Sequence, residues 1–229
     1  MKICLFQMLD RGTVKDNVKR ACEVIENVKA DFICLPEFFA IPGGFLRYSA
    51  LELYQISSYA LKKVIEASLN FDGYVVAGTV VENGYYNTCY VLKDGKVVAK
   101  YRKINPTKEE MRAGIRPGSD VTVIDTEFGK ISFLICADCL NWDTVRRVAS
   151  RSDVIFLPIS LSNPNHPPVE GHPISKKIAD EFDVIVAKVS RVGVWNGKKF
   201  GTKSVVLSKK GIIAEAKKID EELIFANIR

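Results

Sequence analysis

Histidine is scarce in this chain of 229 residues. Its two histidines, His166 and His172, both precede a proline in the turn-rich segment 162–173. Only one pair of cysteines, Cys136 and Cys139, has the C-x-x-C spacing that metal-binding loops use. A structural zinc ion almost always takes four nitrogen or sulfur ligands from such clusters. We therefore predict no metal site, and no motif in the chain requires another cofactor.

Long apolar runs and local concentrations of charge are also missing. No apolar run approaches the roughly 20 residues that a membrane-spanning helix requires, and the first residues lack the layout of a signal peptide. The net charge is +6, but the basic residues are scattered among acidic ones, whereas nucleic-acid binding favours a basic stripe. Most cysteines lie in apolar runs, as buried free thiols do in reducing compartments. We therefore expect a cytoplasmic protein that binds neither a membrane nor nucleic acid.

No linker rich in proline, glycine or serine interrupts the chain, so we predict one domain over residues 1–229. Apolar residues recur at helical spacing over 14–28 and 53–67. Segment 74–82 is expected to form one strand, and the residues around Asp94-Gly95 are typical of a hairpin. Helix-linked strands mixed with hairpins predict an α/β fold, in which two mixed sheets pack together with helices outside.

Three polar residues, Glu37, Lys103 and Cys136, each end an apolar strand-like segment. Catalytic and ligand-binding side chains collect at strand ends in α/β folds. Glu37 lies between a proline and two phenylalanines, and poor solvation there should raise its pKa, as suits a general base that later acts as an acid. The three residues are candidates for one site, and ordinary surface or core positions are the alternative for each.

The C-x-x-C pair leaves several interpretations open. It can be a redox dithiol, which also follows a strand, or half of a metal site. It can instead contain one nucleophile, Cys136, paired with one of the histidines or activated by a carboxylate and a cation. In that case Cys139 is a packing neighbour. A ligand-binding protein without catalytic activity is a further alternative.

Three ordered motifs resemble the signatures of the nitrilase superfamily of carbon–nitrogen hydrolases: LPEFF at 35–39, YRKINPTKEE at 101–110 and FLICADCLNWD at 133–143. The resemblance covers almost the whole chain. It implies an α-β-β-α sandwich in which Glu37 is the general base, Lys103 the cation and Cys136 the nucleophile. It also implies a second glutamate after the lysine. Glu109 and Glu110 are both candidates, and the spacing to the GIRPG turn favours Glu110.

The resemblance further implies hydrolysis of a non-peptide C–N bond through a thioester, with release of ammonia or an amine. A small linear amide or an N-carbamoyl compound is the expected substrate, ahead of a nitrile, and a homodimer or higher oligomer is the expected assembly. The oxyanion is expected to contact Lys103 and a backbone N–H near Ala137 or Asp138. The expected substrate contacts are Asn87, Ala137, Asp138, Phe38 and Trp142, with a structural role in the hairpin as the alternative for Asn87 and core packing as the alternative for Trp142.

The chain departs from the family pattern beside these motifs. Asn105 stands where the family often has histidine, and Ala137 where an aromatic residue often follows the cysteine. The stretch AKVSRVG at 187–193 lacks the usual asparagine. These positions surround the expected pocket and leave the expected catalytic residues intact, so they bear on the substrate more than on the reaction.

Overall fold

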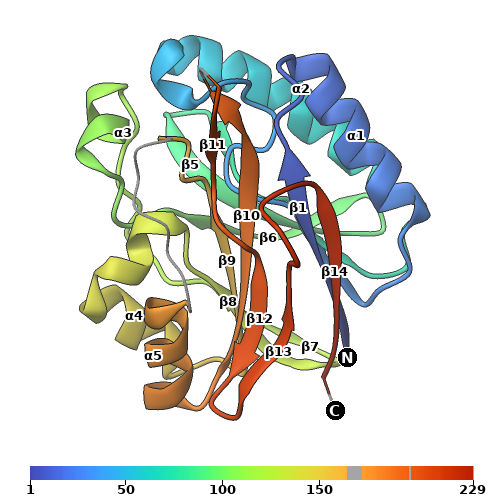
Figure 1. Ribbon diagram of the computed structural model, residues 1–229. Helices are drawn as coiled ribbons and strands as arrows, with labels where there is room; N and C mark the ends of the chain where they lie inside the picture. Colours follow the sequence, from blue (N-terminus) through green and yellow to red (C-terminus); the bar gives the residue numbers. More distant parts are fainter. Residues whose placement is uncertain (164–171, 196, 229) are drawn as a thin grey trace.

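The computed structural model describes residues 1–163, 172–195 and 197–228. Its helices are α1 (Val14–Asn27), α2 (Ala50–Ser68), α3 (Lys108–Arg112), α4 (Trp142–Ala149) and α5 (Pro173–Phe182), with the 3₁₀ turns η1 (Phe45–Arg47) and η2 (Cys136–Leu140). Its strands are β1 (Lys2–Leu9), β2 (Phe32–Cys34), β3 (Tyr74–Val76), β4 (Val80–Glu82), β5 (Tyr86–Lys93), β6 (Lys96–Arg102), β7 (Val123–Thr126), β8 (Gly129–Phe133), β9 (Val154–Ile159), β10 (Ile185–Trp195), β11 (Lys198–Phe200), β12 (Val205–Ser208), β13 (Gly211–Glu215) and β14 (Glu222–Asn227). Figure 1 shows helices on both sides of the strands.

The helices begin where the sequence supplies capping groups. The Thr13 hydroxyl accepts a backbone N–H in the first turn of α1. Ser49 and Glu52 form a reciprocal capping box at α2, and Thr107 and Glu110 form another at α3. Each cap satisfies N–H groups that have no partner within their own helix. The capping box at α3 also fixes the position of the Glu110 side chain.

The strands of the described residues follow one hydrogen-bonded path, whose main order is β4-β5-β3-β2-β1-β10-β9-β8-β7. Along one edge β1 pairs in parallel with β2. Along the other edge it pairs with the antiparallel β14, and near its end Met8 and Leu9 pair with β10. The two sheets expected from the sequence are thus joined, because β1 pairs with strands of both halves.

The two faces of β1 explain why several strands are apolar throughout. Successive side chains point to opposite sides of a strand. Ile3 and Leu5 belong to a core cluster that contains residues from both halves of the strand path, whereas Cys4 and Phe6 belong to the cluster that includes residues of α1 and α2. A third cluster includes residues of α4 and α5. Helices therefore cover outer faces of both halves, and the predicted mixed α/β class is confirmed.

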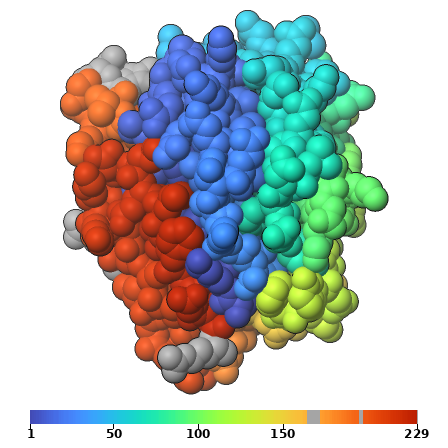
Figure 2. Space-filling view, turned by 90° about the vertical axis from the view of Figure 1, so that its right-hand side faces the viewer, coloured from blue at the N-terminus to red at the C-terminus, as the bar shows by residue number. Residues whose placement is uncertain are grey.

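The two ends of the chain lie side by side on one face of the molecule. Figure 2 shows the α1 region in blue against the C-terminal residues in red. The Glu221 carboxylate contacts Arg11 and Arg20, each at 2.9 Å. The Met1 amino group donates to the Ile228 carbonyl oxygen at 2.9 Å. Hydrogen bonds and ion pairs therefore join the N-terminal and C-terminal segments directly.

Segment 74–82 departs from the single strand predicted from its apolar residues. It forms two strands, β3 and β4, which are separated around Gly78. Gly78 has a φ of +55°, and a Cβ there would lie 2.1 Å from the Pro36 carbonyl oxygen. Glycine alone tolerates both this backbone conformation and this close approach. The break places Thr79 beside the turn that follows β2.

Most other predicted elements are confirmed. The helices expected over 14–28 and 53–67 correspond to α1 and α2, and Asp94-Gly95 joins β5 to β6. The short elements α3 and β11 were not predicted, because so few residues show no clear periodicity. Within the described ranges, no helix has the combined length and apolar character needed to cross a bilayer.

Candidate active site

Glu37 lies in a turn after β2 whose next residue, Phe38, has a φ of 51°. The Phe38 N–H donates to the Thr79 hydroxyl at 3.0 Å, and the Phe38 carbonyl oxygen accepts from the Arg191 guanidinium at 3.4 Å. Non-glycine residues rarely adopt this left-handed conformation, and it persists where surrounding contacts enforce it, often at functional sites. The turn leaves the Glu37 side chain 2% exposed.

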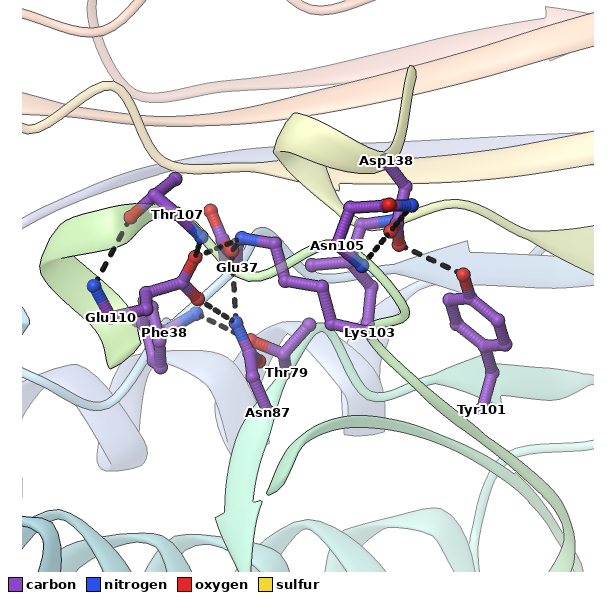
Figure 3. A network of polar contacts seen from close by, with 11 residues as sticks. Glu37, Phe38, Thr79, Asn87, Tyr101, Lys103, Asn105, Thr107, Glu110 and Asp138 are labelled. Carbon is purple, nitrogen blue, oxygen red and sulfur yellow. Dashed lines mark hydrogen bonds and ion pairs between the residues drawn. The ribbon is translucent and has the colours of Figure 1, made fainter. Parts of the chain in front are cut away.

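Lys103 follows β6 and lies between two carboxylates. Its ammonium contacts Glu37 Oε1 at 2.9 Å and Glu110 Oε2 at 2.6 Å. All three residues are buried, whereas Glu109 is exposed. The structure therefore brings two of the predicted catalytic residues together and joins Glu110 to them, as Figure 3 shows. The spacing argument that favoured Glu110 over Glu109 agrees with this placement.

The Asn87 side chain connects the two carboxylates. Its Nδ2 donates to Glu37 Oε1 at 3.0 Å and to Glu110 Oε1 at 2.8 Å (Figure 3). Asn87 is fully buried. Asn87 was suggested as a substrate contact or as a structural residue of the hairpin; its amide group contacts both carboxylates, and it is not among the described residues that line the neighbouring cavity. Its side-chain carbonyl oxygen has no hydrogen-bond partner among the described residues.

Burial and contact set the charges in this cluster. Burial raises the Glu37 pKa above its usual value; Lys103 opposes this effect and Glu110 adds to it. For Lys103, burial alone would lower the pKa, but Glu37, Cys136 and Glu110 together raise it above its usual value. The carboxyl therefore titrates closer to neutral pH than an exposed glutamate, while the lysine stays charged. The cluster combines a proton acceptor with a permanent cation.

Cys136 follows the β8 segment and opens the 3₁₀ turn η2 with a φ of 43°. Burial raises the pKa of its thiol well above the usual value; negative charge on Glu37 raises it further, and Lys103 opposes the rise. The thiol is therefore protonated at rest, and it needs a base to become a nucleophile. The thiol of Cys136 therefore lies in the field of both Glu37 and Lys103.

Asp138 holds the η2 turn in place. Its buried carboxylate accepts the Ile135 N–H at 3.0 Å, the Tyr101 hydroxyl at 2.8 Å and both N–H groups of Asn105 at 2.7 and 3.0 Å. Its own N–H donates to the Ile135 carbonyl oxygen at 3.0 Å. The side chain predicted to contact substrate and the N–H predicted to stabilise the oxyanion are thus both used within the protein. Of the two backbone N–H groups predicted to stabilise the oxyanion, only that of Ala137 is still a candidate.

A cavity of about 420 Å³ opens beside Cys136. Ala137, a predicted substrate contact, lines it. Phe45, Ser160 and Lys188 also line it and were not predicted, and Glu109 and His172, which the sequence suggested for other roles, line it too. One signal could have revealed Lys188, because it interrupts the apolar stretch DVIVAKVSRVG at 183–193. A charged side chain in a buried strand needs a polar partner.

Two predicted substrate contacts lie elsewhere. Phe38 is buried behind the cavity wall, where its ring packs on Phe45 with centroids 5.2 Å apart. Trp142 donates from its indole to Glu181 at 3.1 Å and packs against Phe182 of α5. Neither is among the described residues that line the cavity. An aromatic residue near a nucleophile in sequence is often part of the supporting core, as here.

The alternatives for the C-x-x-C pair fit the geometry less well. Cys136 and Cys139 are free thiols, and no group of three or more acidic, histidine or cysteine residues in the described ranges could hold a metal ion. His172 contacts Lys188 Nζ and Glu215 Oε1, each at 2.6 Å. Both its ring nitrogens are therefore engaged away from Cys136. His166 lies outside the described residues.

Comparisons with known proteins agree with this geometry. A nitrilase of Pyrococcus abyssi is 29% identical over 100% of this chain and 89% of its own length. The omega-amidase NIT3 of Saccharomyces cerevisiae is 25% identical over 100% of this chain and 87% of its own. An amidase from Nesterenkonia sp. AN1 is 20% identical, but its fold matches with a TM-score of 0.85 over 100% of this chain and 90% of that chain.

The family assignment rests on the whole sequence. The sequence pattern of the carbon-nitrogen hydrolase family matches residues 4–229, which include all three motifs singled out above. This chain belongs to the carbon–nitrogen hydrolase family.

Proposed function

We propose that the protein is a cysteine-dependent amidase that hydrolyses a small linear amide through a thioester on Cys136. The observation that carries this proposal is the buried ion-pair cluster of Glu37, Lys103 and Glu110 in the field of a thiol on the cavity wall. Family membership supports hydrolysis of a C–N bond. The cluster supports this particular route.

The first half of the reaction forms the thioester. Glu37 takes the proton of the Cys136 thiol as the sulfur attacks the amide carbonyl carbon. The oxyanion that forms is stabilised by the Lys103 ammonium and by the Ala137 N–H, and one such donor contributes about 3 kcal/mol to the barrier. Glu37 then gives its proton to the leaving nitrogen, the C–N bond breaks, and ammonia departs.

The second half releases the acid. Glu37, again ionised, takes a proton from a water molecule that attacks the thioester carbonyl. The C–S bond breaks as the oxyanion collapses, and the proton on Glu37 returns to the sulfur. Because the pKa of Glu37 is raised by burial, one carboxyl group serves as base and acid in turn. Glu110 and Asn87 hold Lys103 and Glu37 in position throughout.

The cavity supports a small substrate. Its volume of about 420 Å³ lies toward the lower end of the range of small-molecule sites. Among similar proteins, the Nesterenkonia amidase has been solved in complex with butyramide, and the yeast relative is an omega-amidase. An N-carbamoyl compound presents the same reacting carbonyl, so it belongs in any substrate panel.

Location and assembly extend the proposal. Six free thiols suit a reducing compartment, which supports the cytoplasm as the site of action. We also propose a homodimer or a higher oligomer. Light scattering of the purified protein tests the assembly, and a single species with the mass of one chain, 25.5 kDa, would contradict it.

The two cysteines offer a matched test of the chemistry. Ammonia release is measured on a panel of linear amides, N-carbamoyl compounds and nitriles for the wild type, Cys136→Ser and Cys139→Ser. We expect Cys136→Ser to lose at least about a thousandfold in kcat/KM and Cys139→Ser to stay within about tenfold. Mass spectrometry of the rapidly quenched wild type should show an acyl adduct on Cys136.

Two results contradict the proposal. Equal loss in both serine variants, together with turnover that depends on a dithiol, would indicate redox chemistry. Absence of turnover over the whole panel, with tight binding of one compound, would indicate a binding protein.

A further inference from the structure

A second buried lysine, Lys188, lines the same cavity as the nucleophile. It lies on β10 and is 4% exposed, and the cavity wall includes both Lys188 and Cys136. The reaction proposed above gives it no role. A desolvated ammonium on the wall of a ligand cavity, outside the catalytic cluster, needs a separate explanation.

The contacts of Lys188 leave most of its donors unused. Its Nζ contacts His172 Nδ1 at 2.6 Å, and His172 Nε2 contacts Glu215 Oε1 at 2.6 Å. An ammonium only donates, so Nδ1 accepts, and the ring proton on Nε2 points to Glu215. Burial and the charge of Lys188 lower the His172 pKa, which keeps the imidazole neutral. Lys188 therefore faces a neutral partner with one of its three N–H groups.

Among the described residues, no carboxylate is in direct contact with Lys188. The remaining cavity wall near it is largely apolar, with Leu157, Ile159, Leu161 and Ile174 among the described lining residues. Glu215 is reached only through the imidazole. An anion that entered the cavity would supply the missing direct countercharge and accept the free N–H groups. The arrangement is typical of a site that is completed by its ligand.

We propose that Lys188, held by His172 and Glu215, binds a carboxylate that the substrate carries at a distance from the bond that is cleaved. This inference rests on the proposed function, because it assigns the substrate class of the same cavity. The reacting carbonyl lies at Cys136, and the remote carboxylate lies at Lys188. Monoamides of short dicarboxylic acids and N-carbamoyl amino acids share this chemistry.

The test compares acidic substrates with neutral isosteres. Succinamate, glutaramate and adipamate are each paired with the amide in which an isopropyl group replaces the carboxylate, and kcat/KM is measured for each. N-Carbamoyl-β-alanine and its neutral counterpart N-carbamoyl-3-methylbutylamine form a separate arm. The wild type should prefer the acidic member by at least about tenfold in its best pair, the gain expected from a hydrogen bond to a charged group.

The variants identify the residue responsible. Lys188→Met and Lys188→Gln should abolish the preference for the acidic member, measured as the ratio of the two kcat/KM values within each variant. Lys203→Met is the matched control. Lys203 Nζ lies 3.8 Å from Glu215 Oε2, and the Lys203 side chain is 39% exposed. The preference for the acidic member should therefore persist in this variant. A preference ratio within one enzyme does not depend on how much of that enzyme is folded.

The outcomes separate the two proposals. Hydrolysis of neutral amides without any preference for acids overturns this inference and leaves the proposed function standing. An acid preference that survives in both Lys188 variants also overturns it. Failure to hydrolyse any amide or carbamoyl compound removes the proposed function itself. A preference that depends on Lys188 in one arm only supports the carboxylate site and identifies the source of the carboxylate.

Discussion

Two buried lysines, Lys103 and Lys188, lie under opposite electrostatic conditions. Lys103 contacts two carboxylates, at 2.9 and 2.6 Å, and its pKa is raised despite burial. Lys188 contacts a neutral imidazole, and burial lowers its pKa to about 8. Both are almost completely shielded from water. Burial is therefore common to both lysines, and the charge of the direct partner makes the difference.

The comparison separates two uses of a buried cation. A lysine between carboxylates is neutralised by the protein, so it is a fixed part of the machinery whatever the cavity contains. A lysine beside a neutral imidazole has no direct countercharge among the described residues, and an anionic ligand can supply one. Substitutions at the two sites should therefore differ in their effects on activity, on stability and on the response of stability to pH.

The largest effect is expected for Lys103→Met. This variant leaves Glu37 and Glu110 buried without their cation, and removal of one partner of a buried ion pair costs about 3–5 kcal/mol in the free energy of unfolding. Loss of an oxyanion donor should also lower kcat by about a hundredfold or more. Urea denaturation and ammonia release measure the two effects.

Lys100→Met is the control for Lys103→Met. Lys100 lies on β6, the strand that leads to Lys103, and contacts Glu82 at 2.9 Å with its side chain 45% exposed. Its replacement should therefore lower the free energy of unfolding by less than about 1 kcal/mol. Equal destabilisation by Lys103→Met and Lys100→Met would show that the buried ion pairs of Lys103 contribute no more to stability than an exposed one.

A second effect, smaller in stability, is expected for Glu110→Gln. The amide keeps the size and the acceptor oxygen of the carboxylate but removes one charge from Lys103, and we expect about a hundredfold loss of kcat on a neutral amide. Glu109→Gln, one residue away, lies on the cavity wall but outside the Lys103 cluster, so its loss of kcat should be smaller than that of Glu110→Gln. Initial rates of ammonia release decide between them. A greater loss of kcat in Glu109→Gln than in Glu110→Gln would show that Glu109 is the second glutamate.

A third, more local effect is expected for Asn87→Leu. The hydrogen bond from Asn87 lowers the Glu37 pKa, so its loss should raise that pKa further. Glu37 must be ionised to accept the thiol proton, and activity falls as pH decreases through its pKa. The acidic limb of the pH profile of kcat/KM should therefore move to higher pH in the variant. An unchanged limb would show that Asn87 does not tune the base.

The smallest effect is expected for the stability of Lys188→Met, and it has the opposite sign to that of Lys103→Met. The folded-state pKa of Lys188, about 8, lies below its usual value of 10.5, so its charge opposes folding at neutral pH. Methionine should raise the free energy of unfolding by about 1–2 kcal/mol at pH 7. As pH rises from 8 towards 10.5, folded wild type loses this proton before the unfolded chain does, and the advantage of the variant should shrink.

Urea denaturation of both proteins across pH 7–10 measures this difference. Cys139 and Glu215 are the other titratable groups that act on Lys188, and both are retained in the variant. A variant that is less stable than wild type at pH 7 would show that His172 alone compensates the ammonium.

The candidate site was predictable where position along the chain was enough. Glu37, Lys103 and Cys136 could be singled out because each follows an apolar strand, and parallel strands bring such ends together. Glu110 could be preferred because of its spacing to the GIRPG turn. Their catalytic roles stay a prediction, but their close placement follows from local pattern and the order of the strands.

The rest depended on side chains that meet across the fold. Asn87 connects the two carboxylates because of the register between β5 and β6, in which its neighbour Thr88 pairs with Arg102. The carboxylate of Asp138 is fully engaged because Tyr101 and Asn105 converge on it. No periodicity in the sequence encodes such contacts. The break at Gly78 was missed for the same reason, since it reflects the approach of Pro36 from another segment.

The position of β1 has a consequence for how the chain reaches its folded state. This strand pairs with β14 along residues 2–7, and the Met1–Ile228 hydrogen bond closes a loop of 227 residues. Contacts so distant in sequence slow folding, because the chain entropy is lost before they form. During synthesis β1 emerges before β14, so the edge of β1 that pairs with β14 stays unpaired until β14 leaves the ribosome. Pulse-labelled hydrogen exchange should therefore find the amides of β1 and β14 protected together and late.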